Sequence, residues 1–217
     1  MVGGYFDRHR MGYDICGMDG VLEATRTETA VFGYSKGAAM HAKAIEFVTS
    51  VAGKHGPWWG KLVLEVGSKN INDPDEAVRA AFAGSEYLGI DQLSGDGVDL
   101  EMDWVSRMTW WGKFGEAHQG YYNCVVSTEM LEHCESPSRA VWRMLDCLKP
   151  GGLLIITCAG RQRPQHSMYD GGTLNVGEYY ANVLPTRLLT NVASECFEFQ
   201  MAEQNGDLRL WAIKANQ

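Results

Sequence analysis

The feature of this chain that most constrains its fold is the alternation of short apolar segments with segments of helical periodicity. Residues 61–68, KLVLEVGS, contain an apolar run that suits a strand buried on both faces. Further strands are predicted at 86–93, 98–104, 121–130 and 153–159. Helices are predicted at 34–51, 73–84, 136–149, where a Pro150-Gly151-Gly152 turn follows, and about 176–193. This alternation favours a parallel sheet with right-handed crossovers and with helices on both faces.

The end of the chain departs from the alternation. Residues 197–215, FEFQMAEQNGDLRLWAIKA, indicate two strands joined at Asn205-Gly206, a strong signal for a two-residue hairpin. We expect the hairpin to add an antiparallel strand to an otherwise parallel sheet of about seven strands. In such sheets ligands bind beyond the carboxyl ends of the strands, near the point where the strand order reverses.

Composition and charge narrow the class of protein. The net charge is −8 and no run of five basic side chains occurs, which argues against binding nucleic acid. No apolar stretch reaches the ~18–20 residues of a membrane span, and the first residues lack the apolar run of a signal peptide. Six cysteines without a CxxC pair are typical of a reduced, cytoplasmic protein. At 217 residues we expect a single domain, with 1–57 as an N-terminal helical extension and 58–217 as the core.

Acidic side chains gather at the ends of the predicted strands. Glu65, Asp91 and Glu129 end the first, second and fourth strands, and Asp103 lies near the end of the third. A carboxylate at the end of the second strand can accept hydrogen bonds from both hydroxyls of a ribose, and Gly67 lets the backbone approach a ligand. Because Glu65 beside the glycine turn would repel a pyrophosphate, a ligand with a positive sulfonium or amino group fits better.

Four motifs carry a resemblance to a known family. In this order and at this spacing, VLEVGS, YLGID, VVSTEMLEH and LKPGGLLIIT resemble the class I S-adenosylmethionine-dependent methyltransferases. The matching segments run from about residue 61 to 157, nearly half of the chain. The resemblance implies a Rossmann-like methyltransferase fold: a mostly parallel seven-stranded sheet with an antiparallel last strand and helices on both faces. It also implies S-adenosylmethionine as the cofactor and S-adenosylhomocysteine as its product.

The resemblance further implies cofactor-binding roles for the matching positions. They are Glu65, Gly67, Ser68 and Asn70 in the first loop around the methionine part, Asp91 at the ribose, Gln92 and Leu93 beside the adenosine, Asp103 and Trp104 at the adenine, and Ser127, Thr128 and Glu129 at the methionine end. Common family members read E-x-G-x-G-x-G in the first loop, whereas this chain has Lys69 and Ile71 at the later glycine positions. Asn70 and Asn72 tolerate left-handed backbone, which favours a remade loop that still binds.

Two histidines are candidates for a general base. His133 follows Glu132 after the fourth strand, and His166 lies in the loop after the fifth, where the resembling fold builds its acceptor pocket. Histidine can take a proton from an acceptor near neutral pH, although the Glu-His pair is often structural in the resembling family. We expect no metal, because no ligand spacing such as HExxH occurs.

The function expected from these observations is methyl transfer from S-adenosylmethionine by in-line displacement at the sulfonium methyl group. The segments that are free to build the acceptor pocket, 1–57 and 160–177, contain aromatic side chains and few basic ones. A small-molecule acceptor is therefore expected first, and a peptide or protein side chain second. Two alternatives remain open. One is a non-catalytic member of the fold that binds a ligand or partner; the less favoured is a nucleotide-dependent oxidoreductase, against which the missing GxGxxG counts.

Overall fold

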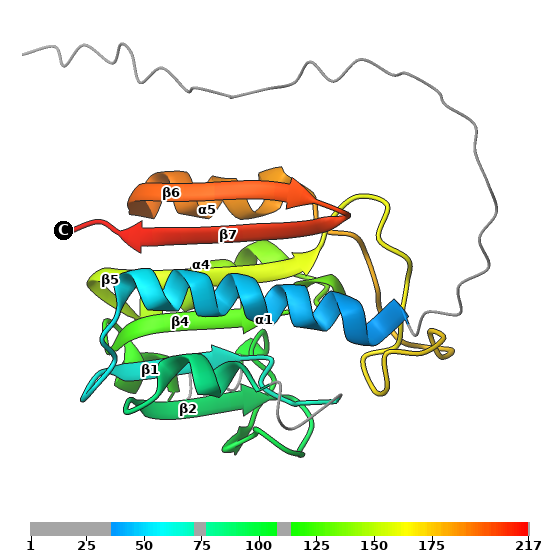
Figure 1. The fold of residues 1–217 in the computed structure, drawn as a ribbon, viewed down its shortest axis with the longest axis horizontal. Helices are drawn as coiled ribbons and strands as arrows, with labels where there is room; N and C mark the ends of the chain where they lie inside the picture. The colour runs from blue at the N-terminus through cyan, green and yellow to red at the C-terminus, as the bar shows by residue number, and fades with distance from the viewer. Residues whose placement is uncertain (1–35, 72–76, 108–113, 217) are drawn as a thin grey trace, which may run out of the picture. The chain divides into compact units, whose positions relative to one another are not determined.

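Seven strands form one mixed sheet in the computed structural model, which describes residues 36–71, 77–107 and 114–216. The strands are β1 (Leu62–Val66), β2 (Glu86–Asp91), β3 (Leu100–Glu101), β4 (Tyr122–Thr128), β5 (Leu148–Ala159), β6 (Cys196–Gln204) and β7 (Asp207–Lys214), in the order β3-β2-β1-β4-β5-β7-β6. Neighbouring strands are parallel except that β7 runs antiparallel to both β5 and β6 (Figure 1). The predicted fold class is confirmed.

Helices cover both faces of the sheet. They are α1 (Lys36–His55), α3 (Gly115–His118), α4 (Pro137–Cys147) and α5 (Pro185–Glu195), with the 3-10 helices η2 (Val78–Phe82) and η4 (Leu131–His133). Helix α1 lies in front of the sheet in Figure 1, and α4 and α5 lie behind it. Among the described residues, no helix is both long and apolar enough to cross a membrane.

Alternating side chains of the central strands fill the two cores. In β1, Val63 packs in the same cluster as Val48 and Val51 of α1, whereas its neighbour Leu64 packs in the cluster that contains Met144 of α4. Successive side chains of a strand point to opposite faces, so a strand such as LVLEV, apolar except for Glu65, is buried on both sides. Helix α1 thus packs directly on the sheet, while the division of the chain at residue 57 remains a prediction.

Three predicted helices have different bounds in the structure. Helix α1 continues through Gly53, which was expected to lie beyond its end, and stops at His55. The helix predicted over 73–84 is wrong for the described part of that range, which holds only the short 3-10 helix η2; Asp73 and Asp75 lie outside the described residues. The last helix begins at Pro185 rather than near residue 176, because proline is favoured in the first turn of a helix and disfavoured inside one.

Two strands also differ from their predicted bounds. The Pro150-Gly151-Gly152 segment, expected to be a turn, is part of β5, which pairs with β4 on both sides of a register shift. Gly151 has a φ of 72°, so the glycine turn signal produces an irregularity within the strand instead of ending it. The third strand is only two residues long, Leu100–Glu101, at the edge of the sheet. The predicted hairpin is correct, with Asn205 and Gly206 at φ values of 55° and 83° between β6 and β7.

Candidate functional site

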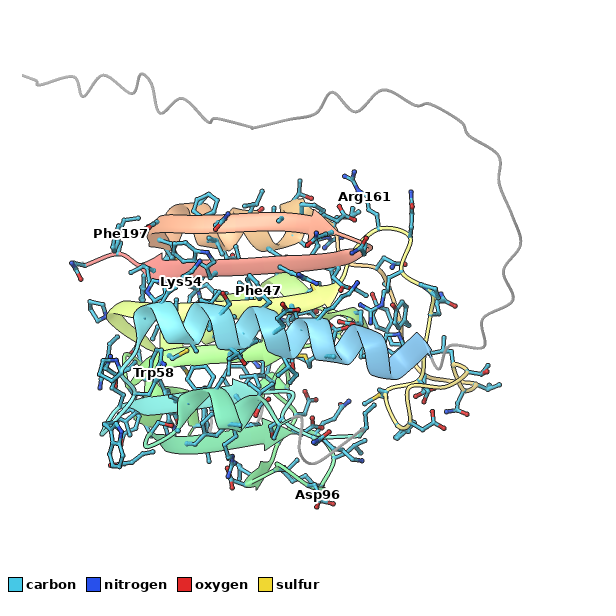
Figure 2. All side chains as sticks on the ribbon, in the orientation of Figure 1. Phe47, Lys54, Trp58, Asp96, Arg161 and Phe197 are labelled. Carbon is cyan, nitrogen blue, oxygen red and sulfur yellow. The ribbon has the colours of Figure 1, made fainter. Side chains whose placement is uncertain are left out.

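A cavity of about 1210 Å³ opens at the carboxyl ends of β1, β2 and β4. Its walls come from the loops after β1 and β2, from the segment that joins β4 to η4, and from residues 163–179. In Figure 2, Asp96 of the wall lies at the end of the sheet to which β2 points, and Trp58 lies at the opposite end. Because sites for one small molecule usually measure ~300–1,000 Å³, this cavity has room for a cofactor and an acceptor together.

Most of the predicted site residues line this one cavity. They are Glu65, Gly67, Ser68, Asn70, Asp91, Gln92, Leu93, Asp103, Trp104, Thr128, Glu129, His133 and His166. Ser127 is not among the lining residues, since its side chain is fully buried within β4. The four carboxylates at or near the strand ends therefore share one space, as expected for parallel strands whose carboxyl ends meet at one edge.

The carboxylate of Asp91 is held in place by two backbone amides. Its Oδ2 accepts a hydrogen bond from the N–H of Lys69 at 3.1 Å, and its Oδ1 accepts one from the N–H of Leu93 at 3.0 Å. These bonds link the end of β2 to the loop after β1. Each oxygen of a carboxylate can accept more than one hydrogen bond, so Asp91 retains capacity for hydroxyl donors in the cavity.

The loop after β1 is pinned to β2 without the usual run of glycines. The N–H groups of Gly67 and Ser68 both donate to the carbonyl of Ile90, at 2.8 and 3.0 Å, and that of Asn70 donates to the carbonyl of Asp96 at 2.9 Å. The altered sequence at Lys69 and Ile71 therefore leaves an ordered loop that lines the cavity.

Two glycines outside the first loop make room for it, and sequence reasoning missed them. A Cβ on Gly89 of β2 would lie 2.8 Å from Oγ of Ser68 and 2.2 Å from the carbonyl oxygen of Gly97. A Cβ on Gly97 would lie 2.5 Å from the carbonyl oxygen of Ser68. The available signal was Gly89 itself, because a glycine inside an apolar strand often marks a close approach of another segment.

Gly67 is required both by its backbone and by its neighbour. Its φ is +81°, and an added Cβ would lie 2.6 Å from Cβ of Met130. We expect Gly67→Ala to lower the free energy of unfolding by about 2–4 kcal/mol, from left-handed backbone and overpacking together. Urea denaturation measures this change.

Gly60→Ala is the matched control for Gly67→Ala. Gly60 also has a positive φ, +66°, but an added Cβ there would have no neighbouring atom within 4 Å. The free energy of unfolding of this variant should fall by only about 1–2 kcal/mol, the cost of a left-handed backbone for alanine. Equal losses in the two variants would show that the contact with Met130 contributes nothing.

Burial changes the acidity of Glu65. Its side chain is buried and accepts a hydrogen bond from the hydroxyl of Tyr87 at 2.9 Å. Burial raises the pKa of Glu65 to about 8, while the Tyr87 hydrogen bond acts in the opposite direction. A positively charged group in the cavity would favour the ionised form, so this carboxyl is suited to a cationic ligand.

The raised pKa of Glu65 predicts a pH-dependent stability. The unfolded chain releases this proton near pH 4.5 and the folded chain near 8, so the wild type loses stability relative to Glu65→Gln as pH rises across that window. The loss should be on the order of a few kcal/mol, measured by urea denaturation without cofactor from pH 4 to 9. Glu86→Gln, at the exposed start of β2, should follow the wild type. If the free energy of unfolding changed with pH in the same way in Glu65→Gln and in the wild type, the raised pKa of Glu65 would be contradicted.

Asp103 and Trp104 line the cavity in different ways. The Trp104 ring is buried against Phe114, with ring centroids 5.9 Å apart, and its Nε1–H donates to the carbonyl of Ala140 at 3.2 Å. Trp104 is thus a core residue with one edge at the cavity wall. Asp103 is exposed, and its Oδ1 accepts the N–H of Val105 at 2.9 Å.

A buried arginine, which sequence reasoning missed, joins three parts of the chain. Nη2 of Arg163 lies 2.8 Å from Oε2 of Glu129, and its Nη1 donates to Asp207 at the start of β7. Oε1 of Glu129 accepts a hydrogen bond from the hydroxyl of Thr157 at 3.1 Å. Burial opposes the charge of Arg163, but the carboxylates of Glu129 and Asp207 outweigh it and raise its pKa.

The two predicted histidines lie next to each other in the cavity wall. The ring centroids of His133 and His166 are 5.0 Å apart, and each ring also packs edge-on against Tyr180, at 5.2 and 5.0 Å. Burial, and then the neighbouring His166, lower the pKa of His133 to about 4; burial also lowers that of His166. Both rings are therefore neutral at pH 7, and His133 is a weak proton acceptor.

The wall formed by residues 163–179 belongs to a loop whose ends are joined. The N–H of Val183 donates to the carbonyl of Ala159 at 2.8 Å, and Nδ2 of Asn182 donates to the carbonyls of Gly160 and Arg163. Inside the loop, the hydroxyl of Ser167 donates to Glu178 at 2.8 Å. The loop leaves the end of β5, forms part of the wall and returns to its starting point before α5.

Sequence comparison identifies a family and several relatives. The family model described as "Methyltransferase domain" matches residues 8–174. The ubiquinone biosynthesis O-methyltransferase of Shewanella pealeana is 26% identical over 136 residues, which cover 60% of this chain and 55% of that protein. The enzyme of the same name from Escherichia coli O139:H28 is 26% identical over 117 residues, 51% of this chain and 48% of that protein. The chain thus spans about half the length of these curated relatives.

Solved structures of known enzymes share the fold. The magnesium protoporphyrin IX methyltransferase of Synechocystis, solved with bound S-adenosylmethionine, superposes with a TM-score of 0.55 at 13% identity and covers 87% of each chain. The 1,6-didemethyltoxoflavin-N1-methyltransferase of Burkholderia thailandensis, solved with S-adenosylhomocysteine, gives a TM-score of 0.52 at 14% identity, with 83% of this chain and 82% of that one covered. At this level of identity the superpositions establish the fold.

Proposed function

This chain belongs to the class I S-adenosylmethionine-dependent methyltransferases, and we propose that it transfers the methyl group of S-adenosylmethionine to a small-molecule acceptor. A peptide or protein side chain is the second choice of acceptor, and a cytoplasmic location is part of the proposal. Membership of this family does not favour the oxidoreductase or the non-catalytic alternative.

The observation that carries the proposal is the position of Asp91. It ends β2 inside the cavity, and its carboxylate is oriented by the amides of Lys69 and Leu93. Both ribose hydroxyls can donate to such a carboxylate. Most of the other predicted residues line the same cavity, which supports the same placement. Gln92, Leu93, Asp103 and Trp104 would flank the adenosine, and Glu65, Gly67, Ser68, Asn70, Thr128 and Glu129 would flank the methionine part, with Ser127 buried behind them.

For methyl transfer, the main task of the protein is to align the acceptor with the methyl group of S-adenosylmethionine. The acceptor attacks the methyl carbon in line with the bond to sulfur, and the electrons of that bond remain on sulfur as S-adenosylhomocysteine forms. Holding the two reactants in this geometry accounts for most of the acceleration that such a site can supply. We place the acceptor against His133 of η4 and His166 of the loop after β5, because both residues line the cavity and neither belongs to the strand ends assigned to the cofactor.

Isothermal titration calorimetry tests the cofactor part of the proposal. S-adenosylmethionine and S-adenosylhomocysteine should each bind with a micromolar dissociation constant, and NAD should not bind. A panel of phenols, amines and carboxylic acids should then include an acceptor that releases S-adenosylhomocysteine. Folded protein that binds neither cofactor form would refute the proposal, and cofactor binding without turnover on any acceptor class would favour a non-catalytic role.

A further inference from the structure

The sequence predicts no metal, yet the fold brings three metal-ligating side chains together. Glu132 and His133 are consecutive in η4, after β4, and His166 lies in the loop after β5. One ligand atom from each of the three lies within 4.8 Å of the other two. The spacing along the chain concealed this cluster, because its members come from two different loops.

The burial and the hydrogen bonding of the Glu132 carboxylate are those expected of a metal ligand. Its side chain is 0% exposed, and no side chain among the described residues hydrogen-bonds to its carboxylate oxygens. The backbone of Glu132 and Ala159 and the charge of Arg163 compensate part of this burial. Nδ1 of His133 is likewise buried without a side-chain partner there. Burial of a carboxyl group is costly, and coordination of a cation is one of the few ways to compensate the remainder.

The ion pairs of Arg163 with Glu129 and Asp207 do not supply a hydrogen-bond donor to the carboxylate of Glu132. Arg163 is the basic side chain near Glu132, but its two Nη atoms form ion pairs with Glu129 and Asp207. Glu129 in turn is occupied by Arg163 and by the hydroxyl of Thr157. The charge of Arg163 favours the ionised form of Glu132 from nearby, but both Nη atoms of Arg163 are directed to Glu129 and Asp207 and not to Glu132.

We propose that Glu132, His133 and His166 bind a divalent transition-metal ion of the zinc class. Two imidazoles and one carboxylate match the preference of such ions, and three protein ligands with a further open position are typical of catalytic zinc. His133 and His166 line the cavity, so the open position faces the space assigned to the acceptor.

The site would select the class of acceptor, an inference that rests on the proposed function. An acceptor hydroxyl oxygen occupies the open position, and coordination lowers the pKa of that hydroxyl, so that it releases its proton to solvent. A lone pair of the same oxygen then forms the new bond to the methyl carbon as the carbon–sulfur bond breaks. The products are a methyl ether and S-adenosylhomocysteine. The metal thus replaces a general base.

The test measures metal binding directly on the full chain. After treatment with EDTA and its removal, Co²⁺ should bind with one-to-one stoichiometry and give visible d–d absorption bands, and Zn²⁺ should displace it. His166→Ala and Glu132→Gln should each weaken Co²⁺ binding by at least about tenfold while circular dichroism stays that of the wild type. His55→Ala, at the end of α1 and outside the cavity, should bind as the wild type does.

The outcomes separate this inference from the proposed function. Absence of one-to-one binding by folded wild type, or equal affinities in His166→Ala and His55→Ala, would overturn the metal site. S-adenosylmethionine is titrated into the same metal-free samples. If it binds while Co²⁺ does not, the metal inference alone fails; if Co²⁺ binds while S-adenosylmethionine does not, the proposed function fails and the metal site stands.

Discussion

Asp91→Ala should weaken the binding of S-adenosylmethionine at least about 100-fold. Each hydrogen bond to a charged group contributes roughly 1.5–3 kcal/mol, and two ribose hydroxyls would lose their acceptor together. The substitution also frees the amides of Lys69 and Leu93, which loosens the loop that faces the cofactor. Isothermal titration calorimetry with S-adenosylhomocysteine, which binds the same site without turnover, measures the loss.

Two further variants sharpen this measurement. Asp91→Asn keeps the shape of the side chain and one carbonyl oxygen. Its affinity for S-adenosylhomocysteine should therefore lie between that of the wild type and that of Asp91→Ala. Glu86→Ala removes a carboxylate from the exposed start of the same strand and should leave the affinity unchanged. If Asp91→Ala binds as tightly as Glu86→Ala, the ribose does not lie at the end of β2.

Arg163→Met should lower the free energy of unfolding by about 3–5 kcal/mol, the range found when one partner of a buried ion pair is removed. The Arg163 side chain is only 5% exposed, and its partners Glu129 and Asp207 are 15% and 4% exposed. Methionine keeps much of the apolar volume but leaves the carboxylate of Glu129 without its cation and that of Asp207 with only the longer contact to Arg209, at 3.6 Å. Urea denaturation at pH 7 measures the change.

Arg161→Met is the matched control for this prediction. Arg161 lies two positions earlier, is exposed, and points away from the sheet in Figure 2. Its substitution should change the free energy of unfolding by less than about 0.5 kcal/mol. Similar losses in Arg161→Met and Arg163→Met would mean that the Glu129–Arg163–Asp207 network does not stabilise the fold.

The sheet could be predicted because its signals are local. β1, β2, β4 and β5 are short apolar runs, and the Asn205-Gly206 hairpin depends on two adjacent residues that tolerate a positive φ. The meeting of Glu65, Asp91 and Glu129 in one cavity follows from parallel strand order alone. The helix bounds were less predictable, since packing on the sheet carries α1 through Gly53 despite that residue's low helix propensity.

The rest of the site could not be predicted because it depends on contacts between distant segments. Arg163 acquires its role only when β7 brings Asp207 beside it. Gly89 matters because the loops after β1 and β2 both approach it closely, through Ser68 and Gly97. The Glu132 cluster likewise forms only when η4 and the loop after β5 come together, so the two histidines were predicted one by one but not as a group.

The joined ends of the loop between β5 and α5 have a consequence for how such proteins diversify. Because the N–H of Val183 donates to the carbonyl of Ala159, the two ends of the loop stay together whatever the length of the chain between them. The entropy of closing such a loop rises by only ~0.6 kcal/mol for each doubling of its length. Insertions and deletions between Arg163 and Tyr180 should therefore cost the scaffold little, whereas Arg163 itself must be kept for its ion pairs with Glu129 and Asp207. The part of the cavity wall formed by this loop can thus change in length while the strand ends that carry Asp91 and Glu65 stay in place.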